Sequence, residues 1–212
     1  MPDLRMSRQF SSFVVFLLLL LAQSSAWAYG DPLRPGETIS QHLTPAILQS
    51  LFPGADRLGE VSGNPPAAAV YKAGQPLGYI FSAWDVTQSR GFSDRPLVLL
   101  VGLTPAGRIT GAKVVHHSEP IIYLGVRDEA FFRLADQFTG YDIKNGVDVV
   151  PWGHDSVSQR TAAGEPVTGK VDAIARATVS SILMSDAIVR GARIIARDRG
   201  ILPANNRPHI DL

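Results

Sequence analysis

Four apolar, strand-like runs between residues 67 and 116 constrain the fold of this chain more than any other feature. They are Ala67–Ala73, Leu77–Trp84, Pro96–Leu103 and Arg108–His116. After its proline, the third run is almost entirely apolar, which is typical of a central strand. Gly74-Gln75-Pro76 after the first run and Pro105-Ala106-Gly107 before the fourth are turn signals. Short turns between successive strands predict an antiparallel sheet.

Three further segments have helical spacing. Thr44-Pro45 opens the first, with Thr44 as N-cap and Pro45 at the first helical position. Residues 128–138 form the second, and residues 180–199, followed by Gly200, are the strongest helix prediction. Residues 59–66 are expected to form a loop. We therefore predict an α+β fold with a mainly antiparallel sheet and flanking helices, which we expect at one side of the sheet.

The N-terminus is typical of an export signal. Arg5 and Arg8 precede an apolar run from Phe13 to Ala22, and Ala26-Trp27-Ala28 fits a cleavage site. We expect residues 1–28 to be a signal peptide or an uncleaved anchor. Residues 29–43 would then be a linker, 44–200 the folded domain and 201–212 a flexible tail. The predicted location is the periplasm, with an N-terminal membrane attachment as the alternative.

Composition excludes several classes of function. The net charge is +1, so there is no global basic field for nucleic acid, and none is expected to bind directly. The chain has no cysteine, which excludes disulfides and thiolate-bound iron–sulfur clusters. His116 and His117 are adjacent on a predicted strand and point to opposite faces, so we expect no metal site.

The segment around Thr178 carries the strongest functional signal. Hydroxyls at Thr178, Ser180 and Ser181 precede the predicted long helix. The first amides of a helix have no partner within the helix, and together with the helix dipole they form an anion site. A phosphate could be held there. The alternative is that Thr178 or Ser180 only caps the helix.

This segment resembles the flavinylation motif of the extracytoplasmic FMN-binding domain family, Asp-x-x-Ser/Thr-Gly-Ala-Thr. Asp172, Ala177 and Thr178 match the motif, whereas Ala175 and Arg176 replace its hydroxyl residue and its glycine. The resemblance implies that Thr178 carries FMN through a phosphoester bond, made by a flavin transferase that takes FMN from FAD. Arg176 would then be placed to pair with a phosphate oxygen.

The resemblance covers most of residues 40–212 and is closest to the periplasmic domain of nitrous-oxide reductase regulators. The His116-x-x-Glu119-Pro120 run is its more specific mark. The predicted cofactor-binding residues are Asp172, Arg176, Ala177, Thr178, Val179, Ser180, Ser181, His116, Glu119 and Pro120. His116 is expected to line the flavin or to be a surface histidine. Four aromatic residues are candidates to stack on the flavin ring or to belong to the core, namely Tyr79, Trp84, Phe92 and Tyr123.

The function that the resemblance implies is electron transfer outside the cytoplasm, in support of nitrous-oxide reductase activity or expression. The expected partners are the flavin transferase and a periplasmic or membrane redox partner such as the nitrous-oxide reductase system. The alternative is a sensor or assembly module that docks on a periplasmic partner. No enzyme motif is present, so we expect a redox carrier or regulatory domain rather than a free-standing enzyme.

Overall fold

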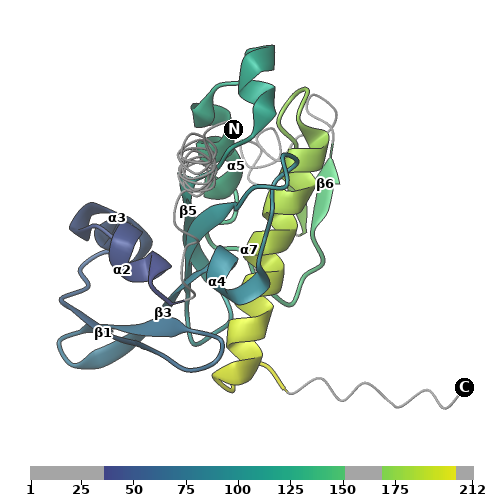
Figure 1. Ribbon diagram of the computed structural model, residues 1–212. Coiled ribbons are helices and arrows are strands. Elements are labelled where there is room, and N and C mark those ends of the chain that lie inside the picture. The colour runs from purple at the N-terminus through teal and green to yellow at the C-terminus, as the bar shows by residue number, and fades with distance from the viewer. Residues whose placement is uncertain (1–35, 151–168, 204–212) are drawn as a thin grey trace, which may run out of the picture. The chain divides into compact units, whose positions relative to one another are not determined.

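The computed structural model describes residues 36–150 and 169–203 (Figure 1). The predicted export signal, residues 29–35 of the predicted linker and residues 204–212 of the predicted tail lie outside the described residues. None of the helices among the described residues is both long and apolar enough to cross a bilayer.

A five-stranded antiparallel sheet forms the centre of the domain, with its strands in sequence order. The strands are β1 (Arg57–Ser62), β2 (Ala67–Lys72), β3 (Gln75–Ser82), β4 (Val98–Leu103) and β5 (Ile109–His116). The turn predicted at 105–107 is confirmed, whereas the first turn is shifted by one residue, because Gln75 and Pro76 already belong to β3. Ala73 and Gly74 join β2 to β3 with positive φ at both residues, as a tight hairpin requires. The antiparallel sheet confirms the predicted fold class.

Helices cover both faces of this sheet, and this differs from the expected one-sided arrangement. They are α2 (Thr38–His42), α3 (Pro45–Leu51), α4 (Ala83–Thr87), η1 (Pro120–Leu124), α5 (Asp128–Asp136) and α7 (Thr178–Asp198). Figure 1 shows α2 and α3 on one side of the sheet and α7 on the other. Every residue of β4 is buried because Leu99 and Val101 pack toward α5 and α7, whereas Leu100 packs toward α2 and α3.

Two local signals were correctly interpreted and one segment was not. The Thr44 hydroxyl caps α3 by accepting a hydrogen bond from the Ile47 amide at 3.2 Å, and Gly200 follows the end of α7 with φ +69°. The loop predicted at 59–66 is wrong for residues 59–62, which belong to β1, whereas residues 63–66 form the turn between β1 and β2. This edge strand has no clear apolar alternation. It is held by backbone pairing with β2 and by the Arg57 guanidinium over the Tyr71 ring.

Part of the predicted linker belongs to the folded domain. Thr38 and Ile39 of α2 are buried, and the Thr38 hydroxyl donates to Asp85 Oδ1 at 2.6 Å. Asp85 lies in α4, which begins where the second predicted strand was expected to continue to Trp84. Ser82 ends β3 and caps α4 by accepting from the Asp85 amide at 3.2 Å. This cap stops the strand two residues early.

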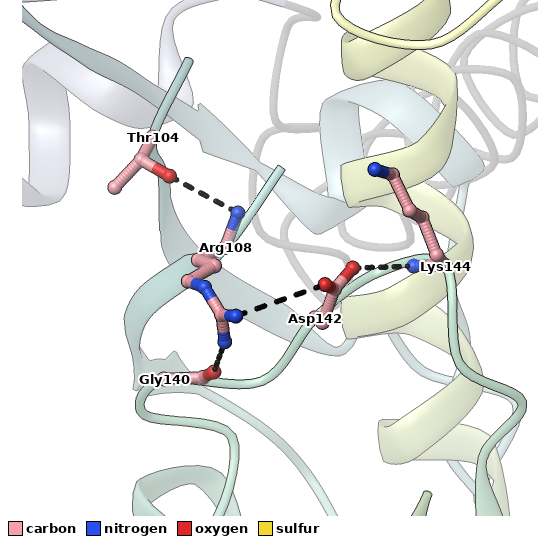
Figure 2. A network of polar contacts seen from close by, with 5 residues as sticks. All are labelled: Thr104, Arg108, Gly140, Asp142 and Lys144. Carbon is pink, nitrogen blue, oxygen red and sulfur yellow. Dashed lines mark hydrogen bonds and ion pairs between the residues drawn. The ribbon is translucent and has the colours of Figure 1, made fainter. Parts of the chain in front are cut away.

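The segment after α5 is fixed to the β4–β5 turn by the polar network in Figure 2. The Arg108 guanidinium donates to the Gly140 carbonyl at 3.2 Å and lies 4.0 Å from the Asp142 carboxylate. Asp142 Oδ1 in turn accepts from the Lys144 amide at 3.0 Å. This anchoring leads the chain into β6 (Asp148–Val150), which pairs in parallel with β7 (Lys170–Asp172). The end of β7 is where the candidate site begins.

Candidate functional site

A sharp turn connects β7 to α7 and presents Thr178 to solvent. β7 ends at Asp172, and α7 begins at Thr178, which is exposed. The N-cap residue is Ala177, and no side chain caps the helix. The alternative in which Thr178 or Ser180 serves as the N-cap is therefore wrong. The first amides of α7 keep their capacity to donate to an anion.

Arg176 gives this turn its shape. Its φ is +68°, in the left-handed region that favours glycine. The related motif has glycine at this position, and the structure supplies the physical reason for that preference. Arg176 adopts the same kind of conformation at a cost of about 1–2 kcal/mol.

Two side chains hold the turn through its backbone. The Gln137 side-chain amide donates to the Asp172 carbonyl at 3.1 Å and accepts from the Asp172 amide at 2.8 Å. The Ser181 hydroxyl accepts from the Ile174 amide at 2.9 Å and donates to the Ala177 carbonyl at 2.8 Å. Both ends of the turn are thus fixed, and the position of Thr178 follows from them.

A buried carboxyl group lies against the first turn of α7. Glu119 is only 3% exposed, and its Oε2 accepts a hydrogen bond from the Ser180 hydroxyl. Its Oε1 is buried with no hydrogen-bond partner among the described residues. The other side of this pair is closed by Gly91, where an added Cβ would overlap Glu119 Oε1. The absence of a side chain at Gly91 thus makes the room for Glu119.

His117 supports this arrangement from the same loop. Its Nδ1 accepts from the Glu119 amide at 3.3 Å, and its Nε2 lies 3.4 Å from Asp128 Oδ1. The ring also packs against Phe131, with centroids 4.4 Å apart. His117 therefore connects the Glu119 loop to α5. His116, the predicted flavin-lining residue, is exposed at the end of β5.

A cleft of about 840 Å³ is lined in part by residues 172–176 of the turn. Its walls are η1, α5 and the 172–176 segment. Apolar groups from Leu124, Val126 and Leu134 contribute to the lining, together with the guanidinium-bearing residues Arg127, Arg133 and Arg176. Thr178 follows Arg176 by two residues and lies next to this cleft along the chain.

The predicted site residues fall into separate groups in the structure. Thr178 and Val179 are exposed, whereas Asp172, Ala177, Ser180 and Ser181 are buried. The Ser180 and Ser181 hydroxyls are bonded to protein groups, so their contribution is to the shape of the turn. Pro120 is half-buried at the start of η1.

The four aromatic residues that were candidates to stack on the flavin ring differ in their exposure. Trp84 is buried and Tyr79 half-buried, as core residues are, whereas Phe92 is 60% and Tyr123 92% exposed. In the same helix as Thr178, Met184 is buried, whereas Ile182 is 49% exposed. It lies on the solvent side of the helix, one turn beyond Thr178.

Sequence reasoning missed the roles of Gly91, Gln137 and the two arginines of α5 and its preceding loop. Gln137 gave no signal, because it occupies the end of an ordinary amphipathic helix. Glycine often marks a close approach of another group to the backbone, so Gly91 was a usable hint.

These features define a class of domain: a small α+β unit that presents an exposed threonine at the start of a long helix whose N-cap residue makes no side-chain capping hydrogen bond. Such a helix start accommodates a phosphate, because its amides and dipole attract negative charge. The residues present therefore fit a phosphorylated cofactor.

Comparison with known proteins identifies the family. Residues 91–192 match the FMN-binding domain. The chain is 33% identical over 186 residues to Protein NirI of Paracoccus denitrificans, covering 86% of this chain and 24% of NirI. It is 28% identical over 166 residues to Regulatory protein NosR of Pseudomonas aeruginosa, covering 76% and 21% of the two chains. Regulatory protein NosR of Stutzerimonas stutzeri gives 28% over 157 residues, with coverages of 74% and 20%.

Residues 91–192 are therefore an FMN-binding domain, the similarity to NirI and NosR supports a domain of the NosR/NirI type, and FMN is its cofactor. The chain spans about a quarter or less of the length of these curated relatives.

Proposed function

We propose that this chain is an exported FMN carrier in which Thr178 holds the cofactor through a phosphoester bond. The observation that carries the proposal is the exposed Thr178 hydroxyl at the start of α7, where no side chain caps the helix. The neighbouring hydroxyls of Ser180 and Ser181 are buried and bonded, so Thr178 is the accessible acceptor in this segment.

The attachment reaction is a group transfer. Thr178 Oγ attacks the flavin-side phosphorus of FAD bound to a flavin transferase, and its proton passes to a base of the transferase or to solvent. The pyrophosphate bond breaks, and AMP leaves. The helix start would then face the new phosphodiester with its amide groups and dipole.

FMN would supply one- and two-electron chemistry, whereas this chain would supply tethering, orientation and the electrostatic surroundings. Held outside the cytoplasm, the domain would exchange electrons with a periplasmic or membrane partner, and the nitrous-oxide reductase system is the partner we propose. On this proposal the chain acts as a carrier rather than as a free-standing enzyme.

The similarity to NosR, which is named a regulatory protein, favours a second candidate, a sensor or assembly module that docks on a periplasmic partner. Photoreduction separates the two. A reduced carrier passes electrons to a periplasmic acceptor, whereas a docking module binds its partner without electron exchange.

The covalent bond is tested by coexpression with a flavin transferase, followed by denaturation. In-gel flavin fluorescence and an FMN-sized mass increment on the Thr178 peptide are expected. Thr178→Val should abolish both signals, whereas Ser180→Ala should keep them because Ser180 is not the acceptor. A protein with no mass increment on this peptide refutes the covalent bond. The mass of the same sample also reports whether the N-terminal signal is cleaved.

A further inference from the structure

Three arginines line the cleft beside the Thr178 turn, and no described residue compensates their charges. Within residues 36–150 and 169–203, Arg127, Arg133 and Arg176 make no side-chain hydrogen bond, ion pair or ring contact. Most of the other described arginines have such partners: Arg190 pairs with Asp186 at 2.8 Å, for example.

The acidic groups of the cleft do not neutralise these three charges. Asp136 is engaged by Lys113 Nζ at 2.8 Å. Asp172 is buried and has an interaction of its own. The rim of the cleft therefore carries a net positive field, which favours an anionic ligand.

Apart from these two acidic residues and Gln137, whose side-chain amide binds the Asp172 backbone, the rest of the lining is apolar. Val126 and Leu134 are buried, Ala130 is half-buried, and Leu124 exposes 62% of its surface. An apolar floor with a few charged groups at the rim is the usual composition of a small-molecule site. The cleft volume of about 840 Å³ also falls in the range of roughly 300–1,000 Å³ that such sites have.

We propose that this cleft is a non-covalent binding site for a flavin phosphate, with the ring on the apolar floor and the phosphate facing the three arginines. The proposal deepens the proposed function and rests on FMN as the cofactor, but it needs no bond to Thr178. A phosphate monoester carries about −1.5 to −2 charge at neutral pH, which matches a rim of unpaired guanidinium groups. Arg176 lies two residues before Thr178, so a phosphate esterified there would stay within the same rim.

The test uses the full chain with Thr178→Val, which removes the covalent acceptor. FMN and riboflavin are titrated separately and followed by flavin fluorescence, because riboflavin has the ring without the phosphate. FMN should bind more tightly than riboflavin. Added salt should reduce only the FMN affinity, because salt screens the attraction between the FMN phosphate and the arginines.

Arginine variants in this background locate the site. The double substitution Arg133→Gln/Arg176→Gln should weaken FMN binding about twofold to tenfold and leave riboflavin binding unchanged. The matched control is Arg197→Gln. Arg197 also has no side-chain partner among the described residues, but it lies 19 residues along α7 from Thr178, roughly 28 Å at the helical rise. It should change neither affinity.

Equal affinities for FMN and riboflavin, or an equal loss with Arg197→Gln, would overturn the cleft assignment. Failure of the covalent proposal gives a different result, namely no mass increment on Thr178 in the chain that keeps this residue. The two proposals can therefore fail independently.

Discussion

Replacing Arg176 by glycine tests the conformation of the turn that presents Thr178. Arg176 has φ +68°, which costs a residue with a Cβ about 1–2 kcal/mol. Glycine removes this cost but adds about 0.5–1 kcal/mol of unfolded-state entropy. Because the exposed Arg176 side chain has no partner among the described residues, no contact is lost. Arg176→Gly should therefore stabilise the protein by about 0.5–1 kcal/mol.

The control is the neighbouring Ala175, which is also exposed and has no positive φ. Ala175→Gly increases the conformational entropy of the unfolded chain but relieves no left-handed backbone conformation. It should therefore destabilise the protein by about 0.5–1 kcal/mol. Denaturant unfolding at constant m-value measures both changes. If Arg176→Gly is no more stable than Ala175→Gly, the turn is not strained at Arg176 in solution. The same variant loses one guanidinium from the cleft, so FMN affinity should fall while stability rises.

Three further perturbations act on buried groups. Ser180→Ala removes the hydroxyl that bonds Glu119 and should destabilise by about 1–3 kcal/mol in denaturant unfolding; a neutral effect would contradict this contact. Gly91→Ala forces Glu119 to move and so disturbs the same contact as Ser180→Ala. The double variant should therefore lose less unfolding free energy than the sum of the two single variants. A fully additive loss would show that the two substitutions act on separate interactions. Burial raises the pKa of Asp85 above 3.8, although the hydrogen bond from Thr38 opposes the shift. The folded state then holds the Asp85 proton more tightly, and stability is lost as pH rises from about 3.8 through the folded pKa. Asp85→Asn should reduce this loss, and unfolding curves that show the same pH dependence for both proteins would refute the assignment.

Local patterns in the sequence were enough for much of the fold. The apolar run of β4, the turn residues and the Thr44 cap each depend on neighbours within a few positions, and all three were predicted. The edge strand β1 was not, because its stability comes from pairing with β2 rather than from its own alternation. Coverage of both sheet faces was missed for a similar reason: it requires α2, which was assigned to a linker.

The site was predictable only in its local part. The motif pointed to Thr178, and the helix start is where the pattern placed it, within two residues. The contact between Glu119 and Ser180 joins residues 61 positions apart, and no spacing rule indicates it. The cleft likewise forms where α5 meets the 172–176 segment, so its arginines carried no recognisable pattern in the sequence.

The way the turn is anchored explains where this chain departs from its family's motif. Gln137 binds the backbone of Asp172, and Ser181 binds the backbone of Ile174 and Ala177. These contacts fix the path of the chain without specifying the side chains between them. The two departures, Ala175 and Arg176, lie between the anchors and are both exposed. The motif's hydroxyl position can therefore become alanine at little cost. The glycine position can become arginine at the cost of the left-handed φ, and the arginine then adds a positive charge to the cleft.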